Sequence, residues 1–99
     1  MEAATVTDPE IARRFAVIYD ENRARVYAFA VSKAGRQLAD EILSETFMIA
    51  WRRFDAVPDP PLPWLLAVAR NVAMSQFRAS ARQQSLAVET GSRDERLAV

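Results

Sequence analysis

The chain has 99 residues, of which 51% are apolar, and its 13 Lys and Arg balance 13 Asp and Glu, so the formal net charge is zero. It has no cysteine and no histidine, which excludes disulfides, thiolate nucleophiles, the usual zinc ligands and imidazole acid–base chemistry. This length suits one domain with a modest core, and no cofactor is expected. We find neither a signal-peptide pattern nor an apolar run long enough to cross a bilayer, and we therefore expect a cytoplasmic protein without membrane insertion.

The first helix is predicted to begin at Thr7-Asp8-Pro9-Glu10, which offers a capping side chain, a proline tolerated in the first turn and an acid near the positive end of the helix dipole. Residues 1–8 are expected to be flexible. Apolar residues then recur at helical spacing at Ile11, Phe15, Ile18, Val26 and Phe29, and Asn22 interrupts them. Gly35 is a plausible C-terminal stop.

The second helix is predicted to begin near Arg36 or Leu38. Glu41 and Glu45 are four residues apart, so they share one face of this helix, with Asp40 beside them. Taken alone, such a run of acids is as often a solvated surface as a binding site. The aromatic side chains that follow favour core packing; they are Phe47, Trp51 and Phe54.

Residues 55–63 hold four prolines, which forbid a continuous helix and predict a stiff connection. The third helix should start near Pro63 or Trp64. Its expected buried residues are Leu65, Leu66, Ala69, Val72, Ala73 and Phe77. No acid lies between Pro60 and Val88, so the charges of this helix are all basic. After Gln83 the chain becomes polar and mixed, and residues 84–99 are interpreted as a linker or disordered tail.

No alternation typical of strands occurs anywhere in the chain. Three amphipathic helices with short connections should pack into a small bundle. The sequence therefore predicts an all-α fold, a single domain of three main helices spanning residues 9–83.

Two blocks of sequence resemble the promoter-binding domain of the extracytoplasmic-function sigma factors of bacterial RNA polymerase. The first is ADEILSETF at residues 39–47 with AWRR at residues 50–53, and the second is PLPWLLAVARN at residues 61–71. The resemblance covers roughly residues 12–82. The second domain of that family, a helix-turn-helix, is absent from this chain, which we interpret as a domain of a longer factor or as a natural one-domain protein.

The resemblance implies a contact between the second helix and core RNA polymerase. Glu41, Ser44 and Glu45 match positions that dock on the basic coiled coil of the clamp in the polymerase largest subunit. Ser44 stands where glutamine is common, so it has less reach. Met48 and Arg52 lie further along that face and extend the expected interface.

The resemblance also implies that the proline-rich loop captures one flipped base of the single-stranded non-template minus-ten element of promoter DNA. Asp55 and Asp59 can accept hydrogen bonds from a base amino group. Trp64 matches an aromatic residue associated with strand separation, although a hydrophobic anchor against the second helix is the simpler interpretation. A polar and basic ridge on the third helix is assigned to phosphates and, through Asn71, to a base or the capture loop; its members are Arg70, Asn71, Ser75, Arg78 and Arg82.

These observations predict an alternative sigma factor domain that binds core polymerase and recognises and helps melt the minus-ten element. It is not expected to be an enzyme, since the chemistry belongs to the polymerase. One alternative is a helical interaction module held by an anti-sigma regulator without direct DNA reading, and an anti-sigma factor is in either case a candidate partner. A small hydrolase or metal-dependent enzyme is disfavoured, because His, Cys and a Gly-rich phosphate loop are all missing.

Overall fold

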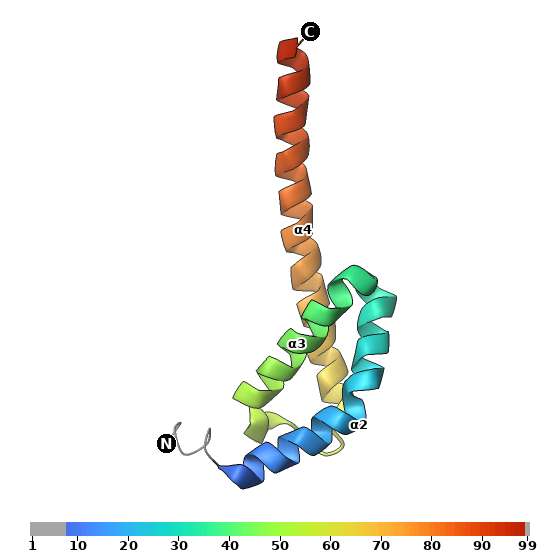
Figure 1. Ribbon diagram of the computed structural model, residues 1–99, viewed down its shortest axis with the longest axis vertical. Coiled ribbons are helices and arrows are strands. Elements are labelled where there is room, and N and C mark those ends of the chain that lie inside the picture. Colours follow the sequence, from blue (N-terminus) through green and yellow to red (C-terminus); the bar gives the residue numbers. More distant parts are fainter. Residues whose placement is uncertain (1–7, 99) are drawn as a thin grey trace.

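A computed structural model describes the backbone of residues 8–98 and the side chains of residues 8–85. Figure 1 labels the helices α2 (Pro9–Ala34), α3 (Arg36–Arg52) and α4 (Leu62–Ala98), with a short 3-10 helix, η1 (Phe54–Ala56), after α3. Residues 8–98 contain no strand, so the predicted all-α fold of three main helices is confirmed. The N-terminal segment predicted to be flexible lies, except for Asp8, outside the described residues.

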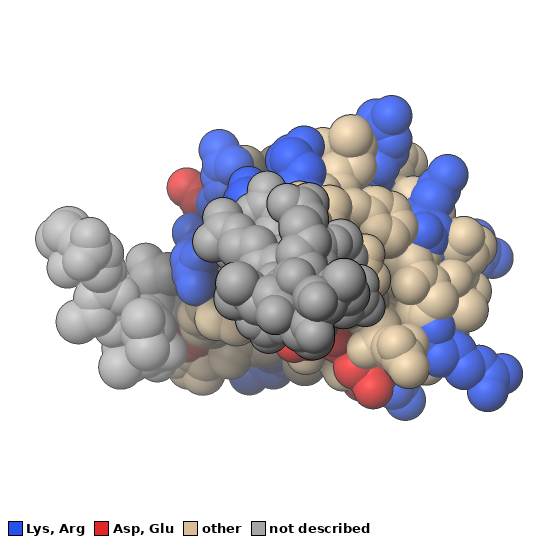
Figure 2. Space-filling model, turned by 90° about the horizontal axis from the view of Figure 1, so that it is seen from above, with Lys and Arg blue, Asp and Glu red and all other residues tan. Residues whose placement is uncertain are grey.

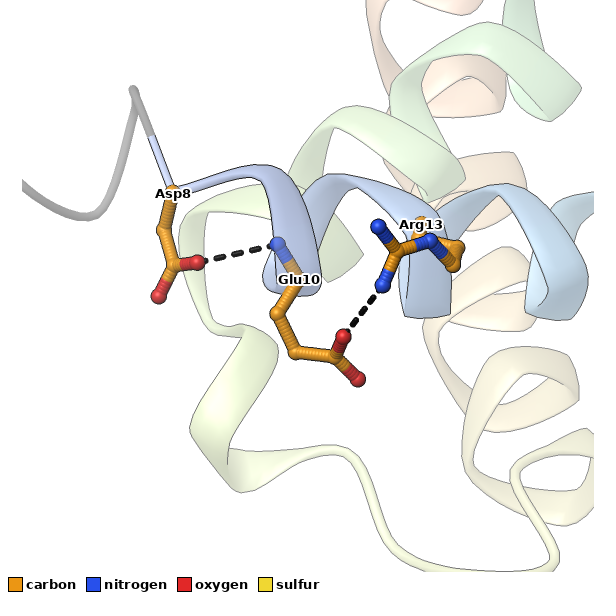
Figure 3. Close-up of polar contacts among 3 residues, drawn as sticks. All are labelled: Asp8, Glu10 and Arg13. Atoms are coloured by element: carbon orange, nitrogen blue, oxygen red, sulfur yellow. Dashed lines mark hydrogen bonds and ion pairs between the residues drawn. The ribbon is translucent and has the colours of Figure 1, made fainter.

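The start of α2 follows the local sequence closely. The Asp8 carboxylate accepts a hydrogen bond from the backbone N–H of Glu10 at 2.9 Å, and Pro9 occupies the first turn, where its missing N–H costs nothing. The Glu10 carboxylate in turn forms an ion pair with Arg13 one turn along the helix (Figure 3). The predicted helix start is therefore confirmed.

A single residue, Gly35, separates α2 from α3. Its backbone N–H caps α2 by donating to the carbonyl of Val31 at 2.8 Å. Its φ of 84° and ψ of 166° lie in a region that is essentially reserved for glycine. Because the chain reverses at this point, Gly35 sets how α3 returns along α2 (Figure 1).

We expect Gly35→Ala to lower the free energy of unfolding by about 1–3 kcal/mol, through backbone strain alone. A Cβ at this position would meet no atom within 4 Å, so crowding adds nothing. Denaturant unfolding measures the effect. The exposed neighbour Gln37 provides the control, since Gln37→Ala should stay within about 0.5 kcal/mol. Equal free energies of unfolding for Gly35→Ala and the unaltered chain would show that alanine is not strained at this position.

The core lies where the three helices face one another. Its fully buried members are Val26, Ala30, Ala39, Ile42, Phe47, Ala50, Leu65, Ala69, Val72 and Ala73. Asn22, which interrupts the apolar pattern of α2, is also buried at 8% exposure. Its side-chain amide donates to the carbonyl of Ile18 at 2.8 Å, which gives the buried polar group a partner. Half-buried side chains surround this core, including Leu43 and Leu66.

Phe77 is not part of this core, and its expected burial is wrong. Its side chain is 44% exposed. The last buried residue of α4 is Ala73, Gln76 is half-buried, and every residue from 77 to 85 is exposed. The apolar pattern of the sequence continues past the point where α2 and α3 still cover α4 (Figure 1), so Phe77 has no helix to pack against.

Helix α4 also continues further than the sequence pattern indicates. The expected end lies near Gln83, whereas the helix runs on to Ala98. No proline follows Pro63, and alanine, arginine and glutamine all favour a helix. The single Gly91 costs only about 1 kcal/mol in a helix interior. The use of residues 84–99 as a linker or tail stays a prediction.

Candidate functional site

The side chains expected to contact polymerase gather on one face of α3. All five are exposed. They border a single shallow groove of about 440 Å³, completed by Asp40 and by Gln76 of α4; the five are Glu41, Ser44, Glu45, Met48 and Arg52. The groove is thus lined by three carboxylates, those of Asp40, Glu41 and Glu45. Met48, whose side chain is 52% exposed, adds apolar surface. Such a groove suits a basic partner with some apolar area.

A second, more apolar groove runs beside the first, between α2 and α3, with a volume of about 470 Å³. Ser44, Met48 and Arg52 border both grooves. Its floor is aromatic. The ring centroids of Phe15 and Trp51 lie 5.2 Å apart in an edge-to-face arrangement. Trp51 is therefore half-buried beside the acidic groove.

A further aromatic contact joins α2 to α3, and a cation–π contact joins α2 to η1. Tyr19 and Phe47 lie 4.9 Å apart, and Phe47 is almost fully buried at 4% exposure. Phe54, at 8%, lies beneath the guanidinium of Arg14, whose Cζ is 5.1 Å from the ring centroid. The packing role predicted for these aromatic residues is confirmed for Phe47 of α3 and Phe54 of η1.

The proline-rich loop lies against the first half of α2. Asp55 and Asp59 are exposed, as their expected role requires. Asp59 borders a groove of about 390 Å³ whose other wall includes Arg13 and Arg14 of α2. Sequence reasoning missed these two arginines, since nothing in their local pattern places them next to a loop more than forty residues away. Arg13 and Arg14 bring positive charge to the loop from α2, which precedes the loop in the sequence, whereas the arginines of α4 follow it.

Trp64 is half-buried in the first turn of α4 and packs against the core, an arrangement that fits a hydrophobic anchor. Leu65, which follows it, is fully buried with an exposed fraction of 0%. Leu65 therefore cannot reach nucleic acid without unfolding, whereas Trp64 keeps part of its surface exposed.

The polar and basic residues of α4 are exposed, as the sequence predicts; they are Arg70, Asn71, Ser75, Arg78 and Arg82. Asn71 and Ser75 line a groove of about 270 Å³ between α4 and α3. Arg53 and Glu45 contribute its opposite wall. Arg53 is the residue that sequence reasoning missed here, because its proximity to Asn71 depends on how α3 and α4 cross.

No acidic side chain among residues 8–85 forms an ion pair with an arginine of α4, and the pair between Glu10 and Arg13 is the one formed within that range. Within the described residues, Arg70, Arg78 and Arg82 are therefore available to contact phosphates. In the view of Figure 2, basic side chains occupy much of the visible outline and acidic ones show in only a few places. The net charge of the chain is zero, but residues 61–88 contain no acid, so the charges are segregated along the sequence.

Two features are absent from the described part of the chain. No group of three or more acidic side chains is arranged to hold a metal ion there. The described helices include none with the length and apolar character that a bilayer crossing requires.

Comparison with known families identifies the class of protein. The model of sigma-70 region 2 matches residues 18–83, about two thirds of the chain. The chain therefore belongs to the sigma-70 region 2 family, whose members are non-enzymatic transcription initiation factors. In general, region 2 binds core RNA polymerase and recognises the minus-ten promoter element. Comparisons with curated proteins and with solved structures found no match.

Proposed function

We propose that this chain is the core-binding and minus-ten-recognising domain of an alternative sigma factor of the extracytoplasmic-function group. In this proposal α3 docks on the coiled coil of the clamp in the polymerase largest subunit. The loop after η1 and the exposed face of α4 hold the unpaired non-template strand. The two blocks of residues 39–53 and 61–71 carry the resemblance to that group, and the family match supports its coarser part.

One observation carries the proposal furthest: the residues expected to contact polymerase border a common groove. Glu41 and Glu45 lie one turn apart on α3, with Met48 following on the same face. A basic coiled coil could pair with these carboxylates while covering Met48. Complementary charge of this kind raises association rates and fixes the orientation of docking.

The DNA surface is supported by charge and by the loop. Exposed arginines of α4 have no described acidic partner, which favours contact with phosphates. The loop holds four prolines within residues 55–63, so little ordering cost is expected when a base is captured. Asn71, at the mouth of a groove beside Arg53, is the side chain best suited to an edge hydrogen bond with a base.

A second function is favoured by the apolar groove between α2 and α3. An anti-sigma regulator with an apolar helix could cover Phe15, Trp51 and Met48 and would then overlap the polymerase groove. If the domain served only this purpose, the ridge from Arg70 to Arg82 would be dispensable. Binding of DNA by the chain, with loss of binding when the ridge is neutralised, separates the two functions.

We expect Arg78→Ala and Asn71→Ala to affect DNA binding in different ways. Arg78→Ala should weaken binding to all single-stranded sequences and flatten the salt dependence by about one counterion or less, because a phosphate contact is lost. Asn71→Ala should relax preference at one or two bases, each worth about 1–3 kcal/mol. Titration against matched and mismatched oligonucleotides at two salt concentrations measures both.

Arg25 provides a matched control for this titration, since it is an exposed arginine of α2 that borders none of the grooves described above. Arg25→Ala should change DNA affinity much less than Arg78→Ala. An Arg78→Ala variant with altered base preference and an intact salt slope would reject the assigned roles.

A further inference from the structure

An apolar pair stands exposed in the middle of the basic face of α4. Met74 is 43% exposed and Phe77 is 44% exposed. They are three residues apart on one helix, so their side chains are neighbours on its surface. Neither belongs to the buried core, and neither borders one of the grooves described above. Packing in the core therefore does not explain why Met74 and Phe77 are apolar.

The residues around this pair are cationic. Arg70, Met74 and Arg78 follow one another at four-residue spacing, so Met74 lies between two exposed guanidinium groups along the helix. Arg70 and Arg78 are about 12 Å apart along the axis, given a rise of about 1.5 Å per residue. Residues 61–88 contain no acid, so the charged side chains that α4 itself places beside the pair are all basic.

This combination restricts what can cover the pair. A neutral apolar protein surface would bury or crowd two guanidinium groups without giving them a carboxylate partner, which is costly. A single strand of nucleic acid supplies both requirements together: phosphates for Arg70 and Arg78, and flat apolar bases for Phe77. The position also suits an extended ligand, because residues 77–85 are exposed where α4 leaves the other two helices (Figure 1).

We propose that Phe77, supported by Met74 and flanked by Arg70 and Arg78, is a stacking platform for an unpaired base of single-stranded DNA. This rests on the proposed function and adds a contact to it. Phe77 does not border the groove of Asn71 and Arg53, and its ring has no donor or acceptor with which to distinguish one base from another. Phe77 therefore contributes affinity, whereas Asn71 contributes base preference.

The test uses the complete 99-residue chain and single-stranded oligonucleotides that carry 2-aminopurine at one position at a time. Its fluorescence reports stacking on an aromatic ring. Phe77→Ala should lower affinity about tenfold for all sequences, with the salt slope unchanged. Phe77→Tyr should bind like the unaltered chain, because it keeps the ring. Phe77→Leu, which keeps apolar area without the ring, should bind less tightly than Phe77→Tyr.

The possible outcomes separate the stacking platform from the proposed function. If the unaltered chain binds DNA with base preference and Phe77→Ala binds equally well, the platform is rejected while the proposed function stands. If the unaltered chain binds no DNA, even with the polymerase clamp fragment, both are rejected. If Phe77→Ala instead abolishes self-association in sedimentation without changing DNA affinity, the pair is a contact between copies of the chain.

Discussion

Replacing Glu41 and Glu45 together by arginine is expected to abolish binding to core RNA polymerase while the domain remains folded. Both carboxylates are exposed on one face of α3 and border the same groove. Neither forms an ion pair or a side-chain hydrogen bond within the described part of the chain, so folding does not depend on them. Against a basic partner, four units of charge change turn attraction into repulsion, and affinity should fall by at least about a hundredfold.

A pull-down with the isolated clamp coiled coil measures this effect, and circular dichroism checks the fold. Asp20→Arg with Glu21→Arg is the matched control, because it makes the same change in net charge at two exposed positions of α2. The control should retain binding to the coiled coil. Undiminished binding by the folded Glu41 and Glu45 double variant would show that another face of the domain docks on polymerase.

Ile42→Ala is expected to reduce the free energy of unfolding by about 2–5 kcal/mol, the range for truncation of a large buried aliphatic side chain. Ile42 is fully buried, with an exposed fraction of 0%, whereas Glu41 and Glu45 on the same helix are exposed. A domain of this size has only a modest core, so the loss is a large part of its stability. Both binding surfaces should weaken together as the unfolded fraction rises.

Urea unfolding followed by circular dichroism tests this prediction. Val17→Ala is the control, because Val17 is 49% exposed on α2 and its truncation should cost far less. Equal losses for the two variants would mean that the core is not centred on α3. A selective loss of polymerase binding in a fully folded Ile42→Ala variant would assign this position to the interface instead.

Local patterns predicted the features that depend on neighbouring residues. The cap at Asp8, the stop at Gly35 and the break between α3 and α4 follow from backbone rules that act over a few positions. The exposed acidic face of α3 was also predictable, because four-residue spacing puts Glu41 and Glu45 on one side of any helix.

Features that depend on how the helices cross could not be predicted from local patterns. Phe77 continues an apolar spacing, but its exposure follows from where α4 leaves α2 and α3. Arg13 and Arg14 come next to the loop, and Arg53 next to Asn71, only through tertiary packing. The sequence signals for these arginines are the same as for any solvated charge.

We propose that this domain reads the minus-ten element as single-stranded DNA while it is bound to polymerase. The most direct measurement is selection from single-stranded oligonucleotides with a randomised minus-ten segment, using the domain in complex with the clamp fragment. We expect the selected oligonucleotides to be enriched in specific bases at one or two positions. This enrichment should be lost with Asn71→Ala and kept with Arg25→Ala. Binding without enrichment of any base, or the same enrichment with Asn71→Ala, would contradict this proposal.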